Sequence, residues 1–127
     1  MKLLLDTNIL IDMLRANQRV MAELREATRL GGEFTTSAIA VAEVYAGVRQ
    51  GEEAHTKRVL EGLPCFGVSR AIGQRAGEMK AEWGKRGKIL TLTDAMIGAT
   101  ALEHGLLLMT NNKKDFPDPG IVFYPNP

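Results

Sequence analysis

The chain has 127 residues, a length that suits one domain built around one hydrophobic core. Its 16 lysines and arginines nearly balance its 15 acidic residues, and the net charge of +1 excludes a strongly basic nucleic-acid scaffold while leaving room for a local basic patch. Apolar residues make up 45% of the sequence, yet no run approaches the roughly 20 apolar residues of a membrane span.

The single cysteine, Cys65, cannot form an internal disulfide, and we interpret it as a small core residue in a reducing compartment. The apolar run that follows Lys2 is interrupted at Asp6, so no secretion signal is recognisable. We therefore expect a cytoplasmic protein.

The first half of the chain alternates strand and helix patterns. Residues 2–5 predict a buried strand, and apolar spacing predicts a helix that starts just after Asn8. A second helix is expected over residues 20–30 and a short strand over residues 33–36. A third helix follows over residues 37–50, with Ser37 as its N-cap, and its nearly continuous apolar sequence predicts burial on all sides.

The second half repeats the alternation. Helices are expected over residues 55–63 and 70–87, with a strand over residues 65–69 between them. Another helix runs to Gly105 with Thr93 as its N-cap. Two last strands are predicted over residues 106–110 and 121–124.

Strands that alternate with helices predict an α/β fold, a three-layer α/β/α sandwich with a central, mostly parallel sheet. In such sheets ligands bind just beyond the carboxyl ends of the strands. Asp6 directly follows the first strand, and Thr110, Asn112 and Asp115 follow the strand that contains "LLLM". We expect these residues to lie at one edge of the sheet.

Three acids are isolated in apolar surroundings. Asp6, Glu43 and Asp94 are each the only charged residue in a stretch of nine residues or more, whereas most other acids lie in mixed polar runs. Each has a structural explanation when taken alone. Asp6 would cap the following helix, Glu43 would form a buried ion pair, and Asp94 would interact with a helix dipole. Asp115 would be an exposed turn residue.

Taken together, four converging carboxylates would repel each other unless a cation lay between them. Mg²⁺ and Mn²⁺ prefer carboxylate and water ligands, so a hard divalent ion would compensate the charge of Asp6 behind its three leucines. Zinc, EF-hand calcium and P-loop motifs are absent from the sequence. His55 and His104 lie in polar, helix-like segments, and we expect them on the surface.

The segments "LLLDTNILID", "SAIAVAEVYAGV" and "TDAMIGATALEHGLLLMTNNKKDF" occur in this order. With these motifs the chain resembles the PIN-domain ribonucleases, specifically the VapC toxins of toxin–antitoxin pairs, over essentially its whole length. The resemblance implies one PIN-like domain over residues 1–127 and a metal-dependent endoribonuclease.

The resemblance also implies roles for individual residues. Asp6 and Asp94 match the most direct ligands of Mg²⁺ or Mn²⁺, Asp115 completes the site, and Glu43 acts through water or on a second ion. Thr110 and Asn112 match residues that brace the acids and meet the scissile phosphate. The expected supporting groups are Thr7, Asn8 and Ser37.

The implied partners are RNA, a cognate VapB-type antitoxin that covers the active site, and a second copy of the chain in a homodimer. Lys113 and Lys114 flank the acidic loop, and we expect them to contact phosphate. Two alternatives stay open: a non-catalytic α/β interaction module whose acids form buried salt bridges, and a DNA-directed nuclease.

Overall fold

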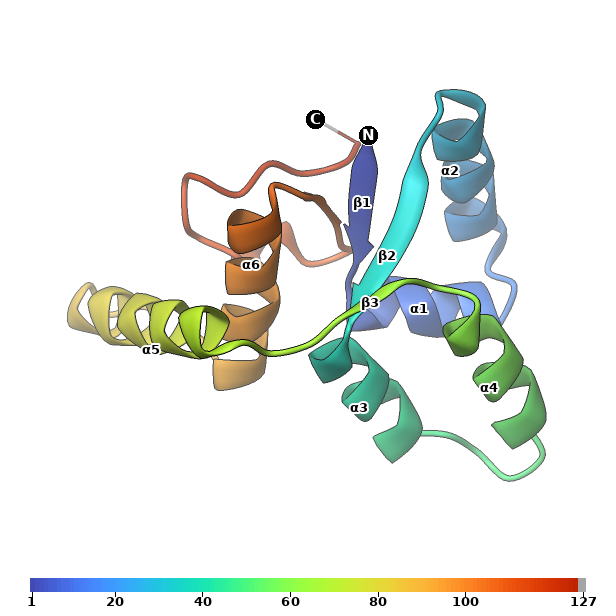
Figure 1. Ribbon diagram of the computed structural model, residues 1–127, viewed down its shortest axis with the longest axis horizontal. Helices are drawn as coiled ribbons and strands as arrows, with labels where there is room; N and C mark the ends of the chain where they lie inside the picture. Colours follow the sequence, from blue (N-terminus) through green and yellow to red (C-terminus); the bar gives the residue numbers. More distant parts are fainter. Residues whose placement is uncertain (126–127) are drawn as a thin grey trace.

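A computed structural model describes residues 1–125 of the chain. Its strands and helices alternate along the sequence (Figure 1). In chain order they are β1 (Lys2–Leu5), α1 (Thr7–Leu14), α2 (Gln18–Arg29), β2 (Glu33–Ser37), α3 (Ala38–Ala46), α4 (Glu53–Glu61), β3 (Cys65–Phe66), α5 (Arg70–Lys85), α6 (Leu92–His104), β4 (Leu107–Met109) and the 3₁₀ helix η1 (Lys113–Asp115).

The four strands form one sheet in the order β3-β2-β1-β4, and every neighbouring pair is parallel. Leu4 of β1 pairs in register with Thr35 of β2 and Leu108 of β4. Helices cover both faces of this sheet, so the predicted α/β fold with a central parallel sheet is confirmed.

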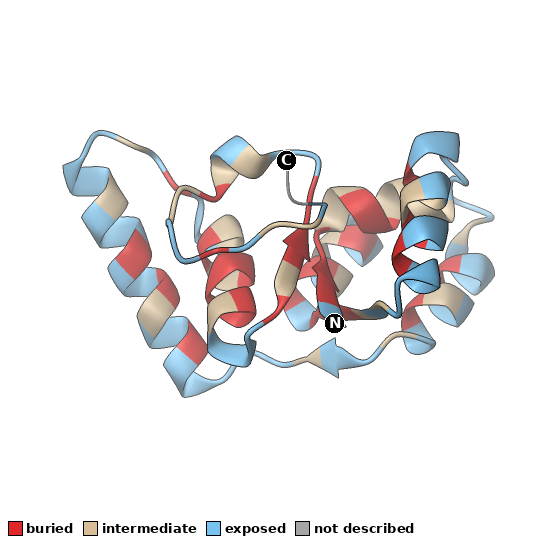
Figure 2. Ribbon diagram, turned by 90° about the horizontal axis from the view of Figure 1, so that it is seen from above, coloured by how far each residue is buried: buried red, intermediate tan, exposed pale blue. Residues whose placement is uncertain are grey.

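The side chains of β1 alternate between two hydrophobic cores. Leu3 and Leu5 pack with α1, α2 and the buried side of α3, whereas Leu4 packs with α6 and the segment after β4. All three leucines are 0% exposed, which explains why this strand is apolar throughout. Figure 2 shows the buried residues on the strands and on the helix sides that face them. A third cluster joins α5 to the outer side of α6.

The carboxyl edge of the sheet collects the chain segments that carry the isolated acids. Asp6 follows β1 directly, and its backbone N–H donates to the carbonyl of Met109 at the end of β4 over 3.0 Å. The N-terminus of α6 lies at the same end of the molecule, and α3 starts there directly after β2 (Figure 1). The expected convergence at one sheet edge is therefore present.

Two helix starts differ from the sequence prediction. Helix α1 begins at Thr7, two residues before the expected start, because the side chain of Asp6 accepts from the N–H of Thr7 and caps the helix. The N-cap of α6 is Thr91 and not Thr93, since the Thr91 hydroxyl accepts from the N–H of Asp94 over 3.2 Å. Ser37 caps α3 as expected, and Gly105 ends α6 with a left-handed backbone, φ 63°.

The last predicted strand, residues 121–124, is wrong. The segment makes only a single parallel bridge, between Phe123 and Leu108. Proline at 117, 119 and 125 brackets the segment, and proline cannot donate to a strand ladder. The strand expected over residues 65–69 is likewise reduced to the two residues of β3.

Two burial predictions are also wrong. Cys65 is exposed and not a core residue, because β3 is the edge strand of the sheet. Helix α3 is not buried on all sides: Ala42 and Ala46 are exposed, and Tyr45 is 40% exposed. The helix lies at the sheet edge, so only one side of it meets the core. Over the part of the chain described, no helix is long and apolar enough to cross a membrane.

Candidate active site

Asp6 is held by three hydrogen bonds at the end of β1. Its Oδ1 accepts from the backbone N–H of Thr7 at 2.8 Å. Its Oδ2 accepts from the hydroxyl of Thr110 at 2.8 Å and from the amide of Asn8 at 3.2 Å. The residue is only 5% exposed, so these donors replace water and fix the carboxylate in one orientation.

Burial has raised the pKa of Asp6 above its ordinary value. Desolvation is the largest cause, and the charges of Asp94 and Glu43 add to it. The hydrogen bonds from Thr110 and Thr7 favour the charged form and lower the pKa, yet the net direction is upward. Within residues 1–125, no lysine or arginine forms an ion pair with Asp6 that would lower its pKa again.

Asp94 lies in the first turn of α6 and is half-buried. Desolvation raises its pKa above the ordinary range, the charges of Asp115 and Glu43 raise it further, and the hydroxyl of Thr91 opposes them. The expected helix-terminus role of Asp94 is thus present, but it does not offset the repulsion from neighbouring acids.

Glu43 and Asp115 complete the group of four acids. The side chain of Glu43 accepts a short hydrogen bond, 2.6 Å, from the hydroxyl of Thr7, which ties α3 to α1. Asp115 ends the 3₁₀ helix η1 and is half-buried. The charge of Glu43 raises the pKa of both Asp6 and Asp94, and the charge of Asp115 raises the pKa of Asp94. Each of the four acids therefore takes part in electrostatic repulsion with at least one of the others.

Asn8 and Thr110 brace the acids. The Asn8 amide donates to both Asp6 and the Thr110 hydroxyl, the latter at 3.4 Å. The Thr110 hydroxyl also accepts from the backbone N–H of Asn112 at 3.0 Å, which draws the loop after β4 towards Asp6. Ser37 differs from these residues, because it is buried and its hydroxyl accepts from the N–H of Ala40 as a helix cap.

The two lysines of the loop differ from each other. Lys114 is exposed, as a phosphate contact requires. Lys113 is half-buried, donates to the carbonyl of Pro125 at 3.2 Å, and lies 5.6 Å from the ring centre of Phe123. It therefore also holds the segment after residue 120 against the loop.

Three residues that sequence reasoning missed support this site. Asn111 donates from its backbone to Asn8 at 3.1 Å and from its amide to Asp12 at 2.9 Å. The guanidinium of Arg19 donates to the Asn111 side chain at 2.9 Å. The contact between Arg19 and Asn111 spans 92 positions in sequence, so no local pattern could have indicated it.

The donor set fits a hard divalent cation. None of the four acids forms an ion pair with lysine or arginine in residues 1–125, so their mutual repulsion is not relieved by the protein. Carboxylate oxygens are the ligands that Mg²⁺ and Mn²⁺ prefer. Across the described chain, however, no three acidic, histidine or cysteine side chains are already arranged to hold an ion, so binding requires side-chain adjustment.

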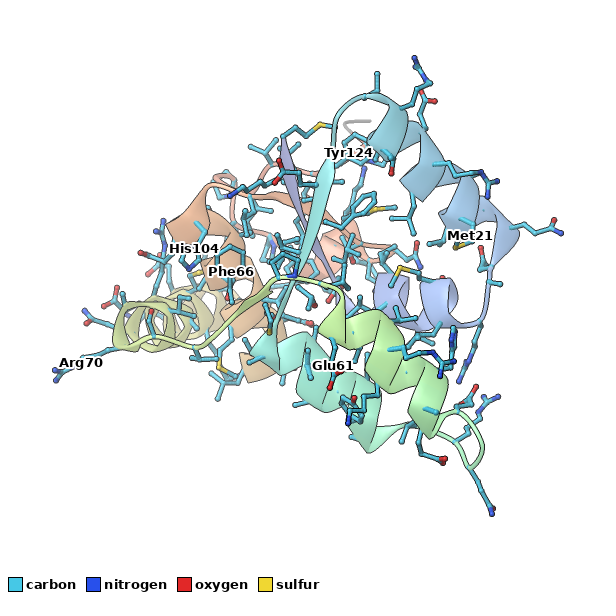
Figure 3. The ribbon with its side chains drawn as sticks, turned by 45° about the vertical axis from the view of Figure 1, so that its right-hand side comes forward. Met21, Glu61, Phe66, Arg70, His104 and Tyr124 are labelled. Carbon is cyan, nitrogen blue, oxygen red and sulfur yellow. The ribbon has the colours of Figure 1, made fainter. Side chains whose placement is uncertain are left out.

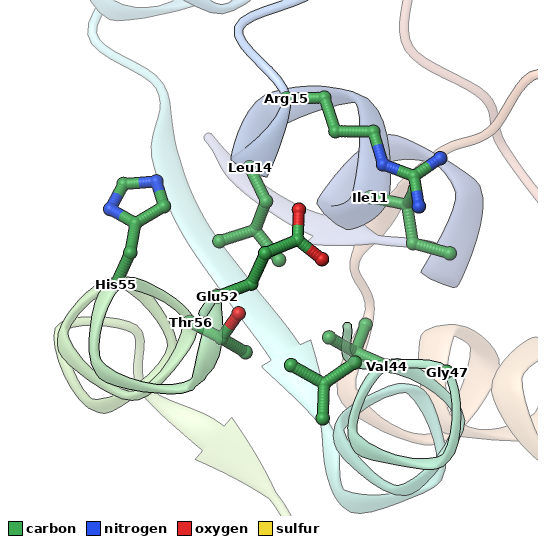
Figure 4. A pocket seen from close by; sticks show the side chains of 9 residues that line it. Ile11, Leu14, Arg15, Val44, Gly47, Glu52, His55 and Thr56 are labelled. Carbon is green, nitrogen blue, oxygen red and sulfur yellow. The ribbon is translucent and has the colours of Figure 1, made fainter. Parts of the chain in front are cut away.

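A separate pocket between α1, α3 and α4 is too small for a nucleotide. Its volume is about 30 Å³, which leaves room for only a few water molecules, and none of the four acids lines it. Arg15, Glu52 and His55 surround it (Figure 4). His55 and His104 are both exposed, as expected, and the His104 ring stacks 4.2 Å from Phe66 (Figure 3).

Comparison with known proteins identifies the family of this chain. The family model described as "PIN domain" matches residues 3–121, and the chain belongs to that family. Among curated relatives, Ribonuclease VapC2 of Haemophilus influenzae is 31% identical over 121 residues, covering 91% of this chain and 90% of the relative. The tRNA(fMet)-specific endonuclease VapC of Shigella flexneri is 27% identical over 122 residues, with 91% and 90% covered.

Solved structures show the same fold. A toxin-antitoxin complex from Klebsiella pneumoniae contains a chain 34% identical to this one, with a TM-score of 0.74 and 94% of each chain covered. The VapBC2 complex of Rickettsia felis, bound to a DNA fragment from its promoter, gives a TM-score of 0.81 at 24% identity and 97% coverage of each chain.

Proposed function

We propose that this chain is a divalent-metal-dependent endoribonuclease and the toxin of a toxin–antitoxin pair, acting as one domain over residues 1–127. Asp6 is the observation that carries this proposal. It is a buried carboxylate, raised in pKa and surrounded by other acids without a compensating cation in the described chain. The names of the VapC relatives add support from outside the structure.

Asp6 and Asp94 would bind the metal most directly, Asp115 would complete the site, and Glu43 would act through water or a second ion. One oxygen of Glu43 is already engaged by Thr7, which favours the less direct role. The metal, when bound, lowers the pKa of a coordinated water and offsets charge that develops on the phosphate.

The chain's own residues contribute orientation and hydrogen bonding. Thr7, Asn8 and Thr110 hold Asp6 so that its carboxylate does not rotate away during the reaction. The other carboxylate oxygen of Glu43 has no hydrogen-bond donor within residues 1–125, and it would accept a proton from the attacking water. Asn112 and Lys114, both exposed, would contact the phosphate.

Metal dependence and RNA preference are tested together. The purified protein should cleave an RNA pool in millimolar Mn²⁺ or Mg²⁺, and excess chelator should abolish cleavage reversibly. DNA of the same sequence should survive, because contacts to the 2′-hydroxyl distinguish the two. Equal cleavage of both polymers would favour the DNA-directed alternative, and metal-independent cleavage would contradict the metal site.

A VapB-type antitoxin and a second copy of the chain are the proposed protein partners. Large apolar side chains remain exposed in the described structure, as self-association surfaces require: Tyr45, Val68, Ile89 and Leu92. Ile89 is 87% exposed, so it contributes nothing to the core of a single chain.

We therefore expect a homodimer in sedimentation experiments at tens of micromolar protein. Ile89→Asp should shift the population towards monomer and leave the far-ultraviolet circular dichroism spectrum unchanged, because the Ile89 side chain lies outside the core. A wild-type chain that sediments as a monomer at that concentration would count against the homodimer.

A further inference from the structure

The side chain of Asn8 is oriented by the loop that follows β4. Its Oδ1 accepts from the backbone N–H of Asn111 over 3.1 Å, and its NH₂ group donates to Oδ2 of Asp6 over 3.2 Å. A backbone N–H can only donate, so the oxygen of the Asn8 amide faces Asn111 and the NH₂ group faces the carboxylate. The position of the Asn111 backbone therefore decides that Asn8 presents a donor, and not an acceptor, to Asp6.

The side chain of Asn111 is held by two residues of opposite charge. Its Oδ1 accepts from the guanidinium of Arg19 over 2.9 Å, and its NH₂ group donates to Oδ2 of Asp12 over 2.9 Å. A guanidinium only donates and a carboxylate only accepts, so these two partners specify which way the Asn111 amide points. Hydrogen bonds to charged partners are also stronger than those between neutral groups.

These contacts join the loop to two helices. Asn8 and Asp12 lie four positions apart on α1, so both side chains reach the loop from one face of that helix. Arg19 reaches it from α2, and its ion pair with Glu23, 3.0 Å long, orients the guanidinium. Asn111 itself is exposed and belongs to no helix or strand. Because burial contributes little to its position, the side-chain contacts carry that task.

We propose that Asn111 is a positioning residue of the active site, held by Asp12 and Arg19 so that Asn8 donates to Asp6. The inference rests on the proposed function, and it adds that the metal ligand Asp6 is oriented through a chain of contacts that reaches α2. Partners that hydrogen-bond to a metal ligand commonly change metal affinity by about ten- to a hundredfold. Asn111 acts one contact further out, so we expect Asn111→Ala to weaken Mn²⁺ binding by about three- to tenfold.

The contact between Asp12 and Asn111 allows a specific test, because an exchange of the two residue types should restore it. Asn111→Asp places two carboxylates against each other, so the loop should be released. Asp12→Asn keeps the contact, since the new amide can turn its oxygen towards the NH₂ group of Asn111. The double variant Asp12→Asn/Asn111→Asp again pairs an amide donor with a carboxylate and keeps the net charge of the wild type. It should hold the loop in place.

The first measurement is hydrogen exchange of the backbone N–H groups of Asn111 and Asn112, followed by NMR in chelator. These groups donate to Asn8 and to the hydroxyl of Thr110, and both residues are exposed, so their protection reports the two hydrogen bonds. Exchange should accelerate about fivefold or more in Asn111→Ala and Asn111→Asp, and return to within about twofold of wild type in the double variant. The N–H of Arg49 is the matched control.

Arg49 suits this purpose because it is also an exposed loop residue whose N–H donates to a side chain, that of Glu52, at 3.1 Å. Its exchange should be the same in all variants. Wild-type exchange of Asn111 and Asn112 in both single variants would overturn the positioning role. A double variant that exchanges as fast as Asn111→Asp would overturn the part assigned to Asp12.

The second measurement is the dissociation constant of Mn²⁺ without RNA, from electron paramagnetic resonance of the free ion. An added negative charge by itself attracts Mn²⁺, so weaker binding by Asn111→Asp has to come from lost orientation. The double variant should bind as the wild type does. A released loop with wild-type Mn²⁺ affinity in Asn111→Ala would overturn this inference alone. A wild-type protein that binds no Mn²⁺ would overturn the metal site of the proposed function.

Discussion

Asp94→Asn is expected to lower the rate of RNA cleavage by at least about a hundred- to a thousandfold while leaving the fold intact. The substitution keeps the volume of the side chain and the bond from the Asp94 N–H to the Thr91 hydroxyl, which caps α6. It removes one of the two proposed direct ligands of the metal, and with it the negative charge that holds the ion.

The measurement is the cleavage rate on one RNA, alongside far-ultraviolet circular dichroism and the thermal midpoint. Glu61→Gln is the matched control, because it also converts a carboxylate to an amide, and its side chain is 67% exposed in a weak pair with Lys57. Glu61→Gln should retain full activity. Wild-type turnover by Asp94→Asn would remove this residue from the active site.

Asp6→Asn is expected to raise the stability of the metal-free protein at neutral pH, by about 0.5–2 kcal/mol. Burial and the charges of Asp94 and Glu43 disfavour the Asp6 carboxylate, and asparagine removes that charge. The amide oxygen still accepts from Thr7, and the hydroxyl of Thr110 can rotate to accept from the new NH₂ group, while the longer bond of 3.2 Å from the Asn8 amide is lost. The same variant should lose cleavage.

The pH dependence of stability follows from the same raised pKa values. The folded chain holds a proton on Asp6 and Asp94 at pH values where the unfolded chain, with ordinary values near 3.8, has released it. The contribution of these two carboxyl groups to the free energy of unfolding of the metal-free protein therefore falls as pH rises above 3.8, and is higher below that value. Asp6→Asn should flatten this fall.

Urea unfolding across a pH series in chelator measures both effects. A large loss of stability in Asp6→Asn, with the wild-type pH dependence retained, would contradict this account. That result would mean that the Asp6 charge is compensated in the folded chain, as the buried-salt-bridge module requires.

The sequence predicted the parts of the fold that depend on continuous apolar runs. Leu3, Leu4 and Leu5 are fully buried, because helices cover both faces of the sheet. A strand in this environment consists almost entirely of apolar residues. The acids were predictable for the same reason, since a lone carboxylate such as Asp6 stands out behind such a strand. Its position at a strand end then placed it at the ligand-binding edge of a parallel sheet.

Features decided by tertiary packing were not predictable. Thr91 and Thr93 are both plausible caps by residue type, and only the position of the Asp94 N–H selects Thr91. The exposure of Tyr45 on α3 depends on which side of that helix meets the sheet.

Long-range polar contacts were missed for the same reason. A groove beside Thr110 brings together residues from α2, the loop after β4 and the segment around Tyr124. The bond between Arg19 and Asn111 joins positions 92 residues apart, and neither residue stands out in its own polar surroundings.

The central claim is that the four acids form a metal site, and the thermal midpoint of wild type and Asp94→Asn, in chelator and in millimolar Mn²⁺, tests it most directly. An ion that binds only the folded chain stabilises it by about 2.7 kcal/mol at a hundred times its dissociation constant. We predict that Mn²⁺ raises the wild-type midpoint by several degrees and leaves the Asp94→Asn midpoint unchanged. Equal midpoints of the wild-type protein with and without Mn²⁺, or an equal rise in both proteins, would contradict the metal site.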